Sequence, residues 1–230
     1  MPSDSHISKI LFNVYVIVCL SVQWRNMKII DISMEISSSI ITYPGNPSPV
    51  IHQYARIPEQ ATNESTISIG SHTGTHVDAG LHVLRDGYDS GMIPLENMYG
   101  RCRVLDLTRA GSEIEREHLK SLDIKKGEII LLKTENSLKQ YETFRNDFAH
   151  VARSGAEFLV ECGIGTIGID YLSVKKFNAD NDVHELLISN MTVYEGLNLV
   201  EVSPGSYTFI AFPLRIKCDA SPARAILIEE

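Results

Sequence analysis

Three of the chain's eight histidines fall within residues 72–82. They are His72, His76 and His82, and Asp78 lies among them. Imidazole nitrogens and a carboxylate form a mixed nitrogen and oxygen donor set that suits Zn²⁺ or Mn²⁺. A neutral imidazole can also accept and donate protons near neutral pH. This window therefore predicts chemistry based on a bound metal, on proton transfer, or on both.

The residues between the histidines are rich in β-branched side chains and glycine, which favours an extended or turn conformation over a helix. Side chains two positions apart share one face of an extended chain, so His72, His76, Asp78 and His82 would point the same way. On a helix, His72 and His76 would align but Asp78 would point elsewhere. Glycines on the same face would let a neighbouring backbone approach closely. The alternative, an ordinary polar strand face, would rarely gather these four residues by chance.

The elements that must position this segment are mostly strands. We predict strands at residues 28–33, 66–69 (half-buried), 101–107, 128–133, 209–216 and 223–228. Short helices are predicted at 115–122 and from Ser154, as its cap, to Cys162, with Gly163 ending it. Residues 184–189 and 191–194 fit two strands, or the end of a helix and a strand. The mixture predicts an α/β fold that is rich in strands.

The chain after Met27 contains no long linker and no internal repeat, which predicts one domain at 27–230. Residues 1–26 form an N-terminal extension with an apolar run at 10–22. This run is shorter than the ~20 residues that cross a bilayer, and no cleavage site of the signal-peptide type follows it. The remaining possibility, which we favour, is that translation begins at Met27, because a strand-like run starts immediately after it.

The composition bounds the partners and the compartment. A net charge of −8 and a pI near 5.5 argue against nucleic-acid binding, which usually needs a basic face. The four cysteines, Cys19, Cys102, Cys162 and Cys218, form no CxxC pair, so we expect reduced thiols. These features are typical of a cytoplasmic protein with reduced thiols, and we expect neither a nucleic-acid nor a membrane partner.

The segment His72-Thr-Gly-Thr-His76-Val-Asp78-Ala-Gly-Leu-His82 resembles the HxGTHxDxPxH signature of the cyclase-like family, which includes bacterial-type kynurenine formamidases and isatin hydrolases. The resemblance covers nearly all of the chain after Met27. Its other segments follow in the family's order: Asp31-Ile-Ser33, Tyr43-Pro-Gly-Asn-Pro47, Gly168-Ile-Asp170 with Ser173, and Ser221-Pro-x-Arg224. It implies the swivelling β/β/α fold of that family.

The resemblance also implies a site with two divalent ions, zinc or manganese. His72, His76 and Asp78 would bind the first ion. Asp78 would bridge to the second, which His184 and Glu195 would complete. From the residues alone, His184 could instead cap a loop, and Glu195 could be a surface acid.

Two further residues carry roles by resemblance. His82 matches the histidine that performs acid/base chemistry, although it could also be a third ligand or a loop residue. Tyr43 stands where relatives place an aromatic beside the substrate ring, although it could simply pack in its turn. The chain departs from the family at Gly80, where the signature has proline and a looser turn is expected, and at Val83, where many relatives carry an aromatic.

The implied activity is metal-dependent hydrolysis of a small aryl amide. The first candidate is an arylformamidase that converts N-formylkynurenine to kynurenine and formate. The alternatives are an isatin hydrolase or another cyclic amide or ester hydrolase, and a non-catalytic module that binds a metal or ligand on the same scaffold. The resemblance further implies a homodimer or a higher homo-oligomer.

Overall fold

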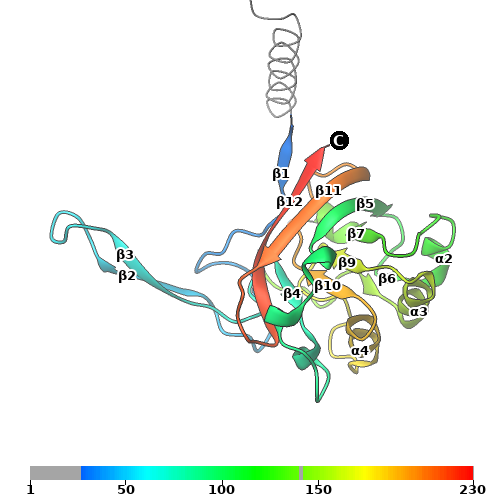
Figure 1. The fold of residues 1–230 in the computed structure, drawn as a ribbon, viewed down its shortest axis with the longest axis horizontal. Helices are drawn as coiled ribbons and strands as arrows, with labels where there is room; N and C mark the ends of the chain where they lie inside the picture. Colours follow the sequence, from blue (N-terminus) through cyan, green and yellow to red (C-terminus); the bar gives the residue numbers. More distant parts are fainter. Residues whose placement is uncertain (1–26, 140–141, 230) are drawn as a thin grey trace, which may run out of the picture.

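The strands of the computed structural model form a barrel at the centre of the molecule (Figure 1). The model describes residues 27–139 and 142–229, so the predictions for residues 1–26 lie outside the described residues. The principal strands are β1 (Ile29–Asp31), β4 (His76–Asp78), β5 (Tyr99–Leu107), β7 (Ile129–Thr134), β9 (Thr166–Ile169), β10 (Thr192–Glu195), β11 (Gly205–Pro213) and β12 (Ala220–Glu229). They form one sheet in the order β1-β12-β11-β5-β7-β9-β10-β4, and β4 also pairs with β12. That last pairing closes the ring and leaves β1 outside it as an edge strand.

Helices and two additional strand pairs lie outside the barrel. The helices are α2 (Arg116–Leu119), α3 (Arg153–Cys162) and α4 (Asp182–Ile188), and the short 3₁₀ helices are η1 (Gly80–His82), η2 (Ser90–Met92), η3 (Leu95–Asn97) and η4 (Glu135–Leu138). Two strand pairs form separate sheets: β2 (Val50–Ala55) with β3 (Glu64–Ser68), and β6 (Glu113–Ile114) with β8 (His150–Val151). No helix in these described ranges has both the length and the hydropathy to cross a membrane.

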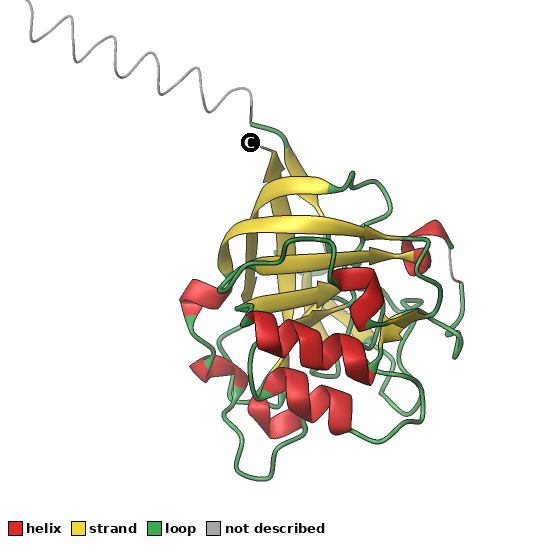
Figure 2. Cartoon of the chain, turned by 90° about the vertical axis from the view of Figure 1, so that its right-hand side faces the viewer, coloured by secondary structure: helices red, strands yellow, loops and turns green. Residues whose placement is uncertain are grey.

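The strand directions explain where the helices lie. Strands β5, β7, β9 and β10 are parallel neighbours, while the other barrel pairings are antiparallel. Parallel neighbours need a crossover connection, usually a helix. Helix α3 connects β7 to β9, and α4 connects β9 to β10. Figure 2 shows these helices gathered on one side of the strands.

The barrel wall separates two apolar clusters. Side chains alternate along each strand, so Leu131 packs inside the barrel with Tyr194, whereas Leu132 packs outside it with Leu159 of α3 and Leu187 of α4. A polar side chain on the outer face of β10 or β4 is therefore covered by α4.

The sequence located most of the barrel. The predicted strands at 28–33, 101–107, 128–133, 209–216 and 223–228 correspond to β1, β5, β7, β11 and β12, with differences at their ends. Gly163 ends α3 in the left-handed conformation with a φ of 67°, as its sequence position predicts. The predicted helix at 115–122 is only the single turn of α2. The predicted cap Ser154 is wrong, because Ala152 is the N-cap residue and Ser154 lies inside α3.

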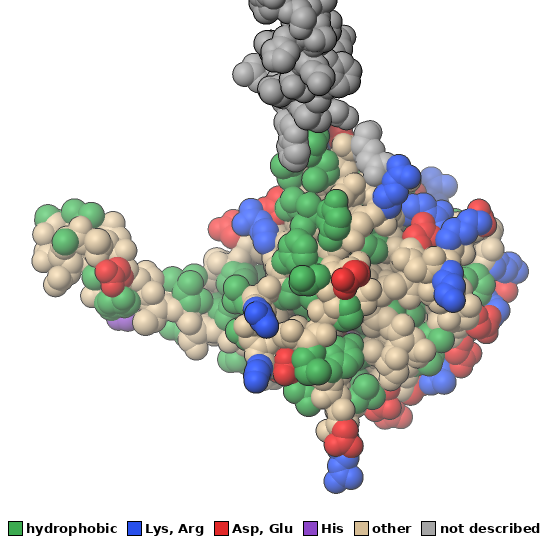
Figure 3. Space-filling view, in the orientation of Figure 1, with side chains coloured by type: hydrophobic (Ala, Val, Ile, Leu, Met, Phe, Trp, Pro, Cys, Tyr) green, Lys and Arg blue, Asp and Glu red, His purple; other side chains and the backbone are tan. Residues whose placement is uncertain are grey.

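The clearest correction concerns residues 66–69, predicted to be half-buried. They belong largely to β3, which is exposed on both faces and pairs only with β2, a strand that the sequence did not predict. This hairpin projects from the barrel as an arm (Figures 1 and 3). The arm, residues 50–68, has exposed apolar side chains at Val50, Ile51, Tyr54, Ile57 and Ile67. A two-stranded hairpin alone is at best marginally stable in water.

Candidate metal centre

The short strand β4 supplies two of the predicted site residues. It lies between β10 and β12 and is fully buried. Because side chains alternate, Val77 packs inside the barrel, while His76 and Asp78 point to the outer face. Glu195 of β10 is the cross-strand partner of His76 and so shares that face. His76 Nε2 lies 3.4 Å from Asp78 Oδ1 and 3.5 Å from Glu195 Oε2.

Helix α4 brings His184 onto the same face. The buried residues of α4 are Val183, His184, Leu187 and Ile188, which form one side of a helix. His184 Nε2 lies 2.9 Å from Asp78 Oδ2 and 3.2 Å from a carboxylate oxygen of Glu195. Of the two structures that the sequence left open for residues 184–189, the helix is the observed one.

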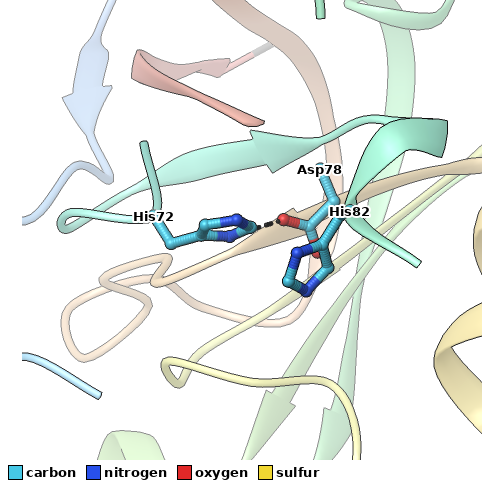
Figure 4. Close-up of side chains that lie close together, drawn as sticks. All are labelled: His72, Asp78 and His82. Atoms are coloured by element: carbon cyan, nitrogen blue, oxygen red, sulfur yellow. Dashed lines mark ion pairs between the residues drawn. The ribbon is translucent and has the colours of Figure 1, made fainter. Parts of the chain in front are cut away.

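The prediction of one extended face is right for His76 and Asp78 and wrong for the two ends of the segment. His72 lies in the turn before β4, and His82 ends the 3₁₀ helix η1. Both nevertheless reach the centre (Figure 4): His72 Nδ1 is 3.0 Å from Asp78 Oδ1, and the rings of His72 and His82 are 4.2 Å apart between centroids. The segment curves around Asp78 and does not run straight past it.

Glycines permit this curvature. Gly74 has a φ of 64°, in the left-handed region that favours glycine, and its carbonyl oxygen accepts a hydrogen bond from His76 Nδ1 at 2.9 Å. A Cβ on Gly80 would lie 2.8 Å from the backbone nitrogen of Tyr88. The expected close backbone approach is thus confirmed. The looser turn expected at Gly80 is wrong, because the backbone there is tightly packed.

The buried polar atoms of this cluster are incompletely paired. Within residues 27–139 and 142–229, two buried side-chain polar atoms lack any hydrogen-bond partner, and both are here: Asp78 Oδ1 and His184 Nδ1. Buried polar atoms are nearly always paired, so such exceptions need an explanation. Asp78 Oδ1 faces imidazole nitrogens of His72 and His76 at 3.0 and 3.4 Å. This arrangement suits a cation placed between the donors.

Two overlapping groups of side chains have the spacing that a metal ion needs. One combines His72, Asp78 and His82, and the other combines His76, Asp78 and Glu195; within each group the donor atoms lie within 4.8 Å of one another. Asp78 belongs to both groups. The donor set of imidazole nitrogens and carboxylate oxygens fits Zn²⁺ or Mn²⁺.

The charges of the cluster are strongly coupled. Burial by itself would lower the pKa of His76 and of His184, but the carboxylates of Asp78 and Glu195, which lie within 3.5 Å of each ring, raise it to about 10. Burial would raise the pKa of Asp78, yet its histidine neighbours hold it well below its usual range. Without a metal, the carboxylates are therefore balanced by protons on the imidazoles.

His82 differs from the other histidines of the centre. Burial lowers its pKa, and the neighbouring His72 and His184 lower it further, although Asp78 opposes this. Its side chain is 30% exposed to solvent. At neutral pH, His82 is thus an uncharged imidazole that faces an open space.

That space is a cleft of about 420 Å³ beside the centre. Its lining includes His72, His82, His184, Glu195, Tyr43, Pro44, Gly45, Asn46, Leu172, Ser173, Lys175 and Asn181. Tyr43 therefore lines the cleft, and its ring also contacts Phe144 and Phe177 at centroid distances of 5.2 and 5.8 Å. The packing role that the sequence left open for Tyr43 is present as well.

Asp219 is a member of the centre that the sequence analysis missed. Its Oδ2 lies 2.9 Å from His72 Nε2 and 3.9 Å from His82 Nδ1. Burial would raise the pKa of Asp219, but hydrogen bonds from Cys218 and His72 lower it to about 2. A carboxylate on the second ring nitrogen of a metal-binding histidine fixes its tautomer and orientation. The available signal was its position two residues before Ser221, where the last segment of the resemblance begins.

The other segments of the resemblance brace this architecture. Arg224 Nε donates to Asp31 Oδ1 at 3.0 Å, which joins β12 to β1. Ser33 Oγ donates to the carbonyl oxygen of Ala225 at 3.1 Å. Asp170 lies apart from the centre and receives hydrogen bonds from the turn at 134–137.

Comparison with known proteins agrees with this geometry. Residues 30–176 match the family model Cyclase, described as "Putative cyclase". The chain belongs to this cyclase family. It is 32% identical to the kynurenine formamidase of Salinibacter ruber, over 87% of this chain and 97% of that protein. The family membership inferred from the histidine signature is thus confirmed.

Solved structures give the same fold. A structure described as a potential metal-dependent hydrolase with cyclase activity superposes with a TM-score of 0.80 at 33% identity, covering 89% of this chain and 98% of that one. Isatin hydrolase A from Ralstonia solanacearum superposes with a TM-score of 0.78 at 22% identity, covering 94% and 97%. The strand-rich mixed fold predicted for the chain is confirmed.

Proposed function

We propose that this chain is a metal-dependent hydrolase of small aryl amides, and that it converts N-formylkynurenine to kynurenine and formate. The observation that carries the proposal is the unpaired buried Asp78 Oδ1, which lies among imidazoles at the side of an open cleft. The similarity to kynurenine formamidases at 32–34% identity supports this choice of substrate.

The residues of the centre divide into two ligand sets that share Asp78. The family resemblance assigns His72 and His76 to the first set and His184 and Glu195 to the second, whereas the spacing of the donor atoms groups His76 with Glu195 and His72 with His82. A divalent cation bound in such a site lowers the pKa of water and polarises a carbonyl oxygen. The backbone nitrogen of Val174 donates to Glu195 Oε1 at 2.6 Å, which holds that carboxylate in place for its set.

His82 is the proton carrier in this proposal. Its lowered pKa keeps the ring uncharged at neutral pH, so it can take a proton from water and pass it to the leaving nitrogen. His82 also lies close enough to His72 and Asp78 to be a ligand. We assign it to proton transfer because it is the most exposed histidine of the centre and lines the cleft.

Tyr43 provides the wall for the substrate ring. Its ring lines the cleft and is backed by Phe144 and Phe177. Aromatic rings pair favourably in offset or edge-to-face arrangements. An aryl amide can therefore place its ring against Tyr43 while its amide carbon points to the histidines.

The test is a substrate panel with purified protein loaded with Mn²⁺ or Zn²⁺. We expect N-formylkynurenine to be hydrolysed with a higher kcat/KM than isatin or related lactams. Preferred opening of isatin would favour the cyclic-amide alternative, for which the structural likeness at 22% identity supports only the fold. Metal binding without turnover of any amide would instead support a non-catalytic module.

The projecting arm supports the homo-oligomer that the family resemblance implies. Ile51 and Ile67 are directly paired across the hairpin and are 48% and 65% exposed. Burying such side chains against a second copy would stabilise the arm. We expect light scattering to show a dimer or larger at micromolar concentration, and the double variant Ile51→Ser, Ile67→Ser to weaken it. A stable wild-type monomer would contradict this.

A further inference from the structure

One positively charged side chain faces the cleft beside the candidate metal centre. Among the described residues that line this cleft, Lys175 is the one lysine or arginine. It directly follows Val174, whose backbone nitrogen binds Glu195. The loop after β9 thus places a positive charge beside the carboxylates and imidazoles of the centre.

The charge of Lys175 has no acidic partner in the described ranges. Its Nζ donates to the carbonyl oxygen of Ala179 at 2.6 Å, which uses one of three N–H bonds. No carboxylate forms a salt bridge with it. The next residue is different: Lys176 Nζ lies 3.0 Å from Glu113 Oε1. Lys175 is half-buried, and its two unused N–H donors favour an anion from outside the chain.

The charges around the cleft give this anion one place to bind. On the side of the histidines, the carboxylates of Glu195 and Asp219 are already paired with imidazoles. Lys175 is the attractive group on the lining. Complementary charges of this kind orient a ligand as well as attract it.

We propose that Lys175 forms a carboxylate-binding subsite that selects aryl amides carrying an acidic side chain. This inference rests on the proposed hydrolase function. The carboxylate of the substrate binds Lys175 Nζ, its ring lies against Tyr43, and its formamide group reaches the histidines. In N-formylkynurenine the carboxylate lies at the end of the side chain ortho to the formamide, so a single molecule carries all three groups.

A matched pair of substrates tests the subsite. N-Formylkynurenine and its methyl ester have the same ring, formamide and ammonium group, and differ in the carboxylate charge. For the wild type we expect kcat/KM to be about 10- to 100-fold higher for the acid, the range given by a hydrogen bond between charged groups. Lys175→Met and Lys175→Gln should abolish this preference, and Lys175→Arg should retain part of it.

Lys176→Met is the matched control, because it removes the adjacent charge, which pairs with Glu113 away from the cleft. It should keep the full preference for the acid. If the Lys175 variants also keep that preference, the carboxylate binds elsewhere, for example at the metal ions, and the subsite is wrong. If the metal-loaded wild type hydrolyses neither compound, the proposed function itself fails. Metal content and thermal unfolding midpoints identify any variant that has not folded.

Discussion

Two buried aspartates of this chain are paired in opposite ways. Asp170 accepts five hydrogen bonds from Thr134, Asn136 and Ser137, and both of its oxygens are satisfied. Asp78 accepts one hydrogen bond, from His184, and its Oδ1 has no hydrogen-bond partner. Their side chains are both buried, so burial alone does not separate a structural carboxylate from a reactive one.

The donors make the difference. Asp170 accepts hydrogen bonds from backbone N–H groups, hydroxyls and an amide. None of these groups would release its proton to bind a metal ion instead. The pKa of Asp170 is raised, because burial outweighs those hydrogen bonds. Asp78 is surrounded by imidazoles, which bind either protons or metals, and they hold its pKa far below its usual range. A buried carboxylate oxygen that lacks a hydrogen-bond partner and lies among imidazoles therefore distinguishes the candidate metal centre from a structural carboxylate.

The largest expected effect follows from replacing the shared ligand. Asp78→Asn keeps the shape but gives a neutral side chain with one good donor oxygen for two ligand sets. We expect kcat/KM for N-formylkynurenine to fall by at least about 10³-fold, because activation of water by the metal is lost. A steady-state assay at saturating Mn²⁺ checks this. Activity near the wild-type level would show that Asp78 is as structural as Asp170.

His82→Ala separates proton transfer from metal binding at the same site. We expect kcat to fall by about 10²- to 10⁴-fold, as is typical when a general acid/base is removed, with metal content unchanged. Kinetics and metal analysis on one preparation give both quantities. Loss of metal from the variant would make His82 a ligand and would overturn its assignment as the proton carrier.

The pH dependence of metal binding tests whether protons and metal ions compete for the imidazoles of the centre. In the metal-free chain, the pKa values of His76 and His184 lie near 10, so both imidazoles are protonated at pH 7. Metal binding must release these protons, and the apparent affinity must therefore fall as pH falls. We expect a loss of about tenfold per pH unit for each proton released between pH 8 and 6. A pH-independent affinity in calorimetric titrations would contradict this.

Asp170→Asn should affect the fold and spare the site. Its new NH₂ group would face backbone and hydroxyl donors, which leaves buried groups unpaired. We expect the free energy of unfolding to fall by about 2 kcal/mol, measured by urea denaturation, with metal content unchanged. A variant of normal stability that loses its metals would place Asp170, unexpectedly, in the metal centre.

Local sequence patterns predicted correctly those side chains of the centre whose direction is set by their position along a strand. The alternation of β4 predicts correctly that His76 and Asp78 share a face. Apolar runs predicted buried strands such as β7, whose first four residues are all buried. The resemblance indicated His184 and Glu195, and the structure places both beside Asp78.

Tertiary contacts decided the rest. His72 and His82 reach Asp78 through turns whose curvature depends on how Gly74 packs against the side chains of Ile36 and Ile40 and how Gly80 packs against the backbone of Tyr88. Asp219 enters the centre because β12 pairs with β4, a contact between segments far apart in the sequence. The arm is exposed because β3 pairs with β2 and does not pack against the barrel. An alternating sequence pattern cannot indicate this.

Counting metal ions tests the bridging role of Asp78 most directly. We would load the wild type, Glu195→Gln and Asp78→Asn with Mn²⁺ or Zn²⁺, remove unbound ions and measure metal per chain. The shared carboxylate predicts two ions for the wild type, about one for Glu195→Gln and almost none for Asp78→Asn. Equal losses in the two variants would argue against the bridge, and full occupancy in Asp78→Asn would contradict the binuclear centre altogether.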